Sequence, residues 1–218
     1  YPPVDLGKFT VNRHPGVSTT TIGSRDSTAS LQNDKPYFLV VSRLVASKNV
    51  DVVVEVCAKL GLSLKVVGTG REMTALKELS TRNRRHETRN KIEFLGDVSD
   101  DELIRLYQNC RAVIFAASQE DFGLVPVEAM AAGKPVIVNA EGGVLESVID
   151  AIPAGKSKGT GVHFDPPTAG SLTLAINNFM DLEKRGYFDP KLIRKHARKF
   201  SKDRFKTQIK KFVEAKVR

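Results

Sequence analysis

Two glutamates eight positions apart, Glu120 and Glu128, are the residues whose surroundings point most directly to chemistry. The stretch from Glu120 to Pro135 reads Glu-Asp-Phe-Gly-Leu-Val-Pro-Val-Glu-Ala-Met-Ala-Ala-Gly-Lys-Pro. In the helix predicted from Val125 to Ala132, every side chain is apolar or proline except Glu128. A carboxylate without a partner on a buried helix is strongly destabilising. The sequence therefore predicts a hydrogen-bonding partner for Glu128, and a binding role explains this residue better than a structural one.

Further residues with chemical potential come directly after the predicted strands. Ser42-Arg43-Leu44 follows the first strand, and Lys48 opens the next helix. The later strands are followed by Gly68-Thr69-Gly70, Gly96-Asp97-Val98, the segment from Glu120 to Leu124, and Glu141-Gly142-Gly143. Two cations, glycines that permit close backbone approach, and helix N-termini together predict a polyphosphate site. Nearby carboxylates would suit the hydroxyl groups of a sugar or a ribose.

Each of these residues also has a purely structural explanation. Arg43 and Lys48 taken singly suit surface charges, while Asp97 and Glu120 suit caps or turns. The glycines suit tight turns, because no third glycine completes a dinucleotide-binding fingerprint. Only Glu128 needs an additional buried partner before a structural explanation suffices.

The elements that position these residues alternate between strand and helix. Predicted strands cover residues 37–42, 63–67, 91–95, 111–116, 135–139 and 161–164; predicted helices cover 49–60, 71–85, 99–109, 125–132, 144–149, 168–182, 190–200 and 202–217. Strands that are apolar throughout, each followed by a helix, indicate a parallel sheet covered on both faces. The expected fold is therefore α/β, a doubly wound, Rossmann-like parallel sheet with a helical C-terminus. In such sheets ligands bind beyond the carboxyl ends of the strands.

Composition indicates an ordinary globular domain. Of the 218 residues, 41% are apolar and 27% charged, which is enough for a sizeable core. Cys57 and Cys110 lie among apolar residues and suit small buried side chains, which favours a reducing, cytoplasmic compartment. No segment approaches the ~20 apolar residues of a membrane span. The start, Tyr1-Pro2-Pro3-Val4, lacks signal-peptide features, and we expect the chain to derive from a longer protein.

The net charge of +9 is concentrated at the C-terminus. Residues 184–218 contain 14 Lys/Arg against 3 Asp/Glu, which leaves 20 against 22 for residues 1–183. A basic helical tail could be a solvated face, could lie on an anionic membrane, or could meet nucleic acid. No nucleic-acid-binding motif is visible and few aromatic residues could stack on bases, so we expect no nucleic-acid partner.

Several segments together carry a family resemblance. They are Glu120-Asp-Phe-Gly-Leu-Val-Pro-Val-Glu128-Ala-Met-Ala-Ala-Gly-Lys-Pro-Val-Ile, Val-Ser-Arg43-Leu-Val-Ala-Ser-Lys48, Val-Val-Gly68-Thr-Gly70, Ile-Glu-Phe-Leu-Gly96-Asp-Val98 and Gly142-Gly-Val-Leu-Glu146-Ser-Val. The first resembles the paired-glutamate motif of retaining glycosyltransferases of family 4, which have the two-domain GT-B fold. The others occur in the order that this family shows. The resemblance implies that the chain is the C-terminal, donor-binding half of such an enzyme.

The resemblance also implies a role for each matching residue. Arg43 and Lys48 would hold the diphosphate and stabilise its developing charge, so no metal or other cofactor is expected. Glu120 would contact the donor sugar, and Glu128 the ribose. The remaining donor-binding residues would be Gly68, Gly70, Asp97, Val98, Phe122, Gly123 and Leu124. Pro126 fits the first helical turn, where its missing N–H leaves no bond unmade.

The resemblance extends to domains and partners. Residues 1–35 would form the interdomain linker and a flexible loop, 36–183 the nucleotide-sugar-binding domain, and 184–218 basic helices packed on it, near an anionic membrane surface. The donor would be GDP-mannose, with Asp97 or Asp100 accepting from guanine, and a UDP-sugar is the alternative. Without its N-terminal half, which would bind the acceptor, the chain would not transfer sugar. A non-catalytic nucleotide-sugar-binding module remains a second possibility.

Overall fold

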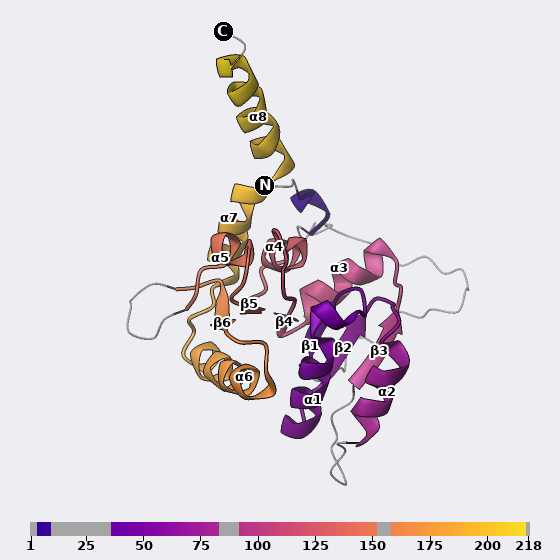
Figure 1. Cartoon of the computed structure of the whole chain (residues 1–218). Helices are drawn as coiled ribbons and strands as arrows, with labels where there is room; N and C mark the ends of the chain where they lie inside the picture. Colours follow the sequence, from indigo (N-terminus) through magenta and orange to yellow (C-terminus); the bar gives the residue numbers. More distant parts are fainter. Residues whose placement is uncertain (1–3, 10–35, 83–91, 152–157, 217–218) are drawn as a thin grey trace, which may run out of the picture.

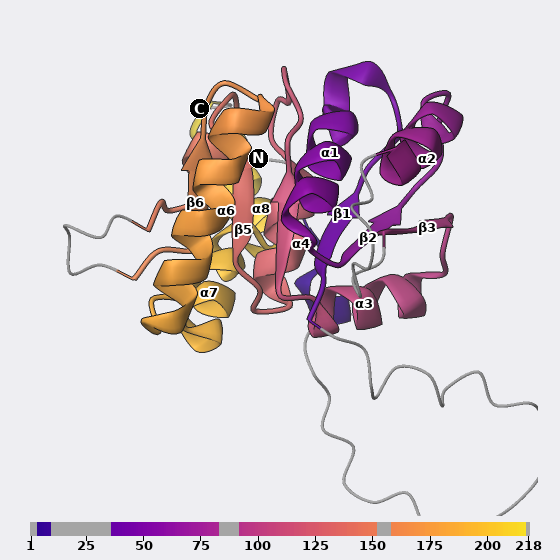
Figure 2. The same cartoon turned by 90° about the horizontal axis from the view of Figure 1, so that it is seen from below.

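Residues 4–9, 36–82, 92–151 and 158–216 are described by the computed structural model. Within them, six parallel strands form one sheet in the order β3-β2-β1-β4-β5-β6 (Figures 1 and 2). The strands are β1 (Phe38–Val41), β2 (Leu64–Val67), β3 (Ile92–Gly96), β4 (Ala112–Phe115), β5 (Val136–Asn139) and β6 (Gly161–Phe164). The predicted linker and loop at residues 1–3 and 10–35 lie outside the described part of the chain.

Helices cover both faces of the sheet, as the apolar strands predicted. They are α1 (Val50–Leu60), α2 (Met73–Arg82), α3 (Asp100–Asn109), α4 (Leu124–Ala131), α5 (Val144–Ser147), α6 (Ala169–Lys184), α7 (Pro190–Ala197) and α8 (Lys202–Lys216), with the short 3-10 helices η1 (Leu6–Phe9), η3 (Ala46–Lys48) and η4 (Arg198–Phe200). Figure 1 shows α1, α2 and α6 on one face and α3, α4, α5 and α7 on the other. The doubly wound, Rossmann-like fold is confirmed.

Alternate strand residues enter two separate cores. In β1, Leu39 joins the core that contains residues of α3, α4 and α7, whereas Phe38 and Val40 join the core that contains residues of α1, α2 and α6. This alternation follows from the period of two along a strand. The strand order reverses between β1 and β4, so the connections that follow these two strands lead in opposite directions. In doubly wound sheets, ligands bind in the crevice between two such connections.

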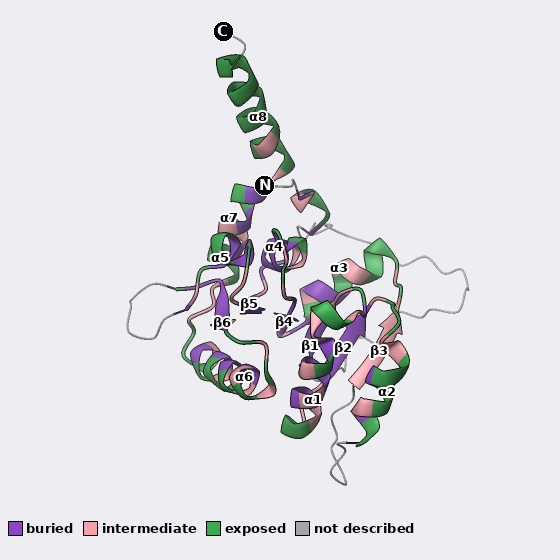
Figure 3. Ribbon diagram, viewed as in Figure 1, coloured by how far each residue is buried: buried purple, intermediate pink, exposed green. Residues whose placement is uncertain are grey.

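The two C-terminal helices within residues 184–218, which were expected to pack on the domain, differ from each other. Helix α7 packs against α4, where the Arg194 guanidinium donates to the Ala132 carbonyl at 3.1 Å. Helix α8 has no buried residue and projects away from the sheet (Figures 1 and 3). Six of its residues are Lys or Arg, so most of its surface favours water. Its apolar residues Ile209, Phe212 and Val213 are exposed.

The cysteines and the helix lengths agree with the composition. Cys57 and Cys110 are buried and free, and burial raises the pKa of each thiol to about 12, so both behave as small apolar side chains. In the described ranges, no helix combines the length and the apolar character that crossing a bilayer requires.

Candidate functional site

Lys48 and Glu120 were predicted as site residues from segments far apart in the chain. The two side chains are in contact in the crevice beyond the carboxyl ends of β1 and β4. The Lys48 ammonium lies 2.5 Å from Glu120 Oε2, and the two side chains are only 17% and 27% exposed. Asn49, in the left-handed conformation at φ 49°, donates its amide to the Ala116 carbonyl and the Ser118 hydroxyl, both at 2.9 Å. This amide ties the lysine-bearing loop to the end of β4. The pair is therefore held on both sides of the crevice.

Arg43 is an exposed residue of a loop whose backbone lies against two glycines. A Cβ on Gly68 would lie 1.9 Å from the Ser42 carbonyl oxygen, and one on Gly70 would lie 2.2 Å from that of Leu44. Gly68 has a φ of +117°, which side chains rarely adopt. These glycines thus let the ends of β1 and β2 approach each other. Their contact with a donor remains a prediction.

Two further glycines bring the end of β5 to the backbone around Glu120. A Cβ on Gly142 would lie 2.2 Å from the Glu120 carbonyl oxygen, and Gly143 N–H donates to the same oxygen at 3.2 Å. The Glu141 carboxylate accepts the Gln119 N–H at 3.2 Å. The Gly-Gly pair is therefore required for close packing of two loops, and Glu141 helps to hold the segment that carries Glu120.

The N-terminus of α4 presents backbone groups at the same edge. Gly123 precedes the helix with a φ of +77°, and Leu124 is its exposed first residue. Phe122 has its ring buried against Phe200, with ring centroids 5.7 Å apart. Pro126 occupies the third helical position, where an N–H has no intrahelical partner. The first turn of α4 can therefore bind anionic or sugar oxygens.

Asp97 and Val98 follow β3 at the outer side of this edge. Asp97 is exposed, and Val98 is half-buried against the core shared with α3 and α4. The Gly68 N–H donates to the Gly96 carbonyl at 2.8 Å, which joins this loop to the loop after β2. The position suits a nucleotide base, a role that stays a prediction.

Glu128 has a partner within the fold. The buried Tyr107 hydroxyl, from α3, donates to Glu128 Oε2 at 2.9 Å. Burial raises the pKa of the Glu128 carboxyl, whereas the Tyr107 hydrogen bond opposes this rise by stabilising the carboxylate. Burial and the nearby Glu128 charge raise the pKa of Tyr107, so Tyr107 remains a donor. A tyrosine is thus the hydrogen-bonding partner predicted for Glu128, and it satisfies one of the two carboxylate oxygens.

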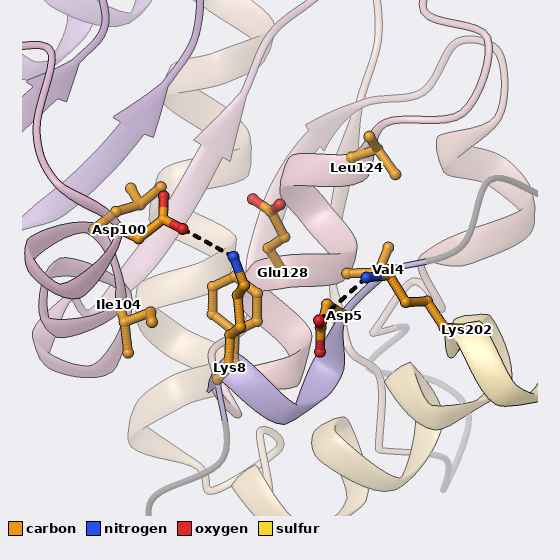
Figure 4. Close-up of a pocket in the computed structure, with 10 residues that line it drawn as sticks. Val4, Asp5, Lys8, Asp100, Ile104, Leu124, Glu128 and Lys202 are labelled. Atoms are coloured by element: carbon orange, nitrogen blue, oxygen red, sulfur yellow. Dashed lines mark hydrogen bonds and ion pairs between the residues drawn. The ribbon is translucent and has the colours of Figure 1, made fainter.

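Glu128 also lines a cavity of about 260 Å³ (Figure 4). Lys8 of η1 crosses it to reach Asp100 Oδ2 at 2.8 Å, and the Asp5 carboxylate accepts from Lys202 at 3.1 Å. Further lining residues are Val4, Phe9, Leu103, Ile104 and Leu124. The cavity therefore combines side chains from residues 4–9, from α3, from the first two turns of α4 and from the start of α8.

The structure thus brings three of the predicted residues into two clusters. Lys48 and Glu120 form the first, at the sheet crevice, and Glu128 with Tyr107 forms the second, at the cavity. Sequence reasoning missed Tyr107 and Lys8. A buried tyrosine hydroxyl needs a partner, but nothing local indicates that this partner lies on another helix.

A family profile matches this sequence. The profile described as "Glycosyl transferases group 1" matches residues 25–202, which is most of the chain. The chain belongs to this family. The matched region includes the predicted residues of the two clusters, Lys48, Glu120 and Glu128. It also includes Arg43.

Curated relatives match only part of their own length. The D-inositol 3-phosphate glycosyltransferase of Mycolicibacterium smegmatis is 30% identical over 179 residues, covering 78% of this chain and 39% of the relative. The alpha-1,3/1,6-mannosyltransferase ALG2 of Dictyostelium discoideum is 27% identical over 137 residues, covering 54% of this chain and 33% of the relative. The group 1 chain therefore spans about a third of these proteins.

Solved structures share the fold. Sucrose-phosphate synthase from Thermosynechococcus elongatus superposes with a TM-score of 0.75 at 24% identity, covering 98% of this chain and 51% of the synthase. Anabaena Alr3699/HepE in complex with UDP and glucose gives 0.73 at 21% identity, covering 98% and 55%. The group 1 fold seen here thus corresponds to about half of each of these chains.

Proposed function

We propose that this chain is the C-terminal, donor-binding half of a retaining glycosyltransferase of family 4 that moves a hexose from a nucleoside diphosphate sugar to a glycan or lipid-linked acceptor. The observation that carries the proposal is the Lys48–Glu120 pair at the crevice where the strand order reverses. Beside it lies the N-terminus of α4, whose next turn bears Glu128. A cation, a helix N-terminus and two carboxylates are the groups that a diphosphate joined to two sugars requires.

The roles follow from the chemistry of each group. Arg43 and Lys48 hold the diphosphate and stabilise the charge that develops as the glycosidic bond breaks, which makes the reaction metal-independent. Glu120 accepts from a hydroxyl of the donor sugar once Lys48 turns toward phosphate. Glu128 accepts from the ribose, and the base lies along Asp97 and Val98. The acceptor binds to the N-terminal half, which lies outside this chain. The enzyme acts in the cytoplasm.

We keep GDP-mannose as the proposed donor. Two matched relatives are mannosyltransferases by name, and Asp100 lines the same cavity as Glu128, where a carboxylate can accept from the guanine N1 and N2 hydrogens. The HepE complexes contain UDP or UDP-glucose, which supports the alternative of a uridine donor.

Calorimetric titration of the chain with GDP-mannose, GDP, UDP and UDP-glucose tests both parts of the proposal. We expect the guanosine ligands to bind most tightly and Glu128→Ala to weaken them by about tenfold. We expect the chain alone to transfer no sugar and to gain turnover when combined with an N-terminal half. Tighter UDP binding would overturn the guanosine assignment, while turnover by the chain alone would contradict the division into halves.

The proposed membrane-facing tail makes a separate prediction about α8. Its Lys and Arg residues attract anionic lipid, and exposed Ile209, Phe212 and Val213 offer apolar surface. Vesicles containing phosphatidylserine should sediment the chain, while neutral vesicles should not. Removing residues 206–218, which leaves Lys202 at the cavity but takes away most of the basic and apolar surface of α8, should abolish sedimentation without altering nucleotide binding. Equal recovery of both forms in the supernatant would remove the membrane part of the proposal and leave α8 to contact the rest of a longer protein.

A further inference from the structure

Buried tyrosine hydroxyls on this face of the sheet have two different kinds of partner. Tyr37 donates to a backbone carbonyl, that of Leu106, at 2.9 Å. The neighbouring Tyr107 donates instead to the Glu128 carboxylate at 2.9 Å. A carbonyl would have satisfied Tyr107 equally well without placing a charge beside it. The choice of a carboxylate on α4 therefore relates Tyr107 to Glu128 rather than to the core alone.

The position of the Tyr107 ring does not depend on Glu128 alone. Tyr107 is fully buried, and the Phe9 ring packs edge-on against it, with centroids 5.6 Å apart and an interplanar angle of 81°. The hydroxyl consequently has little freedom, and the carboxylate that accepts from it is held as well. A free glutamate side chain would lose rotamer entropy when a ligand ordered it, whereas a carboxylate already held by Tyr107 would lose less.

We propose that Tyr107 is a positioning residue for the nucleotide ribose, because it holds the Glu128 carboxylate in the orientation in which its remaining acceptor sites face the cavity. This inference rests on the proposed function, since the ribose belongs to the donor. Glu128 lines the cavity while Tyr107 does not, so Tyr107 acts through Glu128 without touching the ligand.

The groups around Glu128 predict how the preference for ribose depends on pH. Burial raises the pKa of Glu128, the Tyr107 hydroxyl lowers it, Asp100 raises it and Lys8 lowers it. The carboxylate is the better acceptor for ribose hydroxyls, so preference for ribose declines as pH falls toward this pKa. Removing the Tyr107 hydroxyl raises the pKa further, and the decline then begins at a higher pH.

The test compares Tyr107→Phe with Tyr37→Phe as a matched control that also removes one buried hydroxyl. Each variant and the unaltered chain are titrated with GDP and 2′-deoxy-GDP, or with the uridine pair if uridine binds more tightly, from pH 5 to 8. We expect the unaltered chain to prefer the ribonucleotide by about tenfold. Tyr107→Phe should reduce that preference severalfold and shift its pH dependence upward, while Tyr37→Phe should leave both unchanged.

A second measurement needs no ligand. The carboxyl-carbon chemical shift of Glu128 reports its pKa directly, and we expect that pKa to rise in Tyr107→Phe but not in Tyr37→Phe. An unchanged pKa together with an unchanged ribose preference would overturn the positioning role. If the unaltered chain bound no nucleoside diphosphate, the proposed function would fall and the ribose role with it, even though the shift in pKa would still be observed.

Discussion

Replacing Arg43 and Lys48 together with alanine is expected to weaken binding of the preferred nucleoside diphosphate by roughly 100-fold or more. Each cation is proposed to form a charge-assisted hydrogen bond to phosphate, and such bonds contribute about 1.5–3 kcal/mol. The parent nucleoside, which lacks phosphate, should bind the variant and the unaltered chain equally. Calorimetry with the diphosphate and the nucleoside measures the two effects separately.

The matched control removes two positive charges from α1 and α2 instead. Lys59 and Arg82 lie in the last turns of α1 and α2, and each pairs with a glutamate four residues earlier. Lys59→Ala with Arg82→Ala should change diphosphate affinity by less than about threefold, since exposed ion pairs contribute little and distant charges are screened. Similar losses in both double variants would show that net charge, and not the crevice, governs binding.

A methyl group at Gly68 is expected to destabilise the fold by about 3 kcal/mol, or about 10 °C in melting temperature. The added Cβ would lie 1.9 Å from the Ser42 carbonyl oxygen, and the φ of +117° is itself strained for alanine. The neighbouring atoms belong to the backbone, so no side chain can move aside. Thermal unfolding followed by circular dichroism measures the change.

Gly96→Ala separates backbone strain from close contact. Gly96 also has a positive φ, +67°, but a Cβ there would meet nothing within 4 Å. We expect Gly96→Ala to cost only about 1 kcal/mol. Gly68→Ala should also displace the loop that carries Arg43, and hence weaken nucleoside diphosphate binding in the folded protein. Equal melting temperatures for the two variants would contradict the close approach of the β1 and β2 loops.

The position of the strands could be predicted because their signals are local. Continuous apolar runs bounded by glycines and polar residues placed every strand within a residue or two of its observed bounds, as in the predicted strand 161–164 and the observed Gly161–Phe164. Parallel pairing then requires all carboxyl ends to share one edge. Arg43, Lys48 and Glu120 could therefore be assigned to a single site before any contact was known.

Whether α8 packs against the domain could not be predicted in the same way. Its pattern correctly predicted a helix over 202–217, and the structure has Lys202–Lys216. Whether a helix packs depends on apolar area offered by another element, which no local pattern records. Helix α7 finds that area on α4 through Ile193 and Ala197, while α8 has no buried residue.

The sequence by itself determined the fold class and identified the residues capable of chemistry, because apolar periodicity, glycines and isolated charges are properties of short segments. Only the tertiary structure decided which of these residues meet. Lys48 reaches Glu120 across 72 positions, Lys8 reaches Asp100 across 92, and Tyr107 reaches Glu128 from a different helix. Each contact depends on how helices cover the sheet and which side chains they turn toward one another. Glu128, the single acidic residue of an apolar helix, thus has Tyr107 as its partner only because α3 packs beside α4.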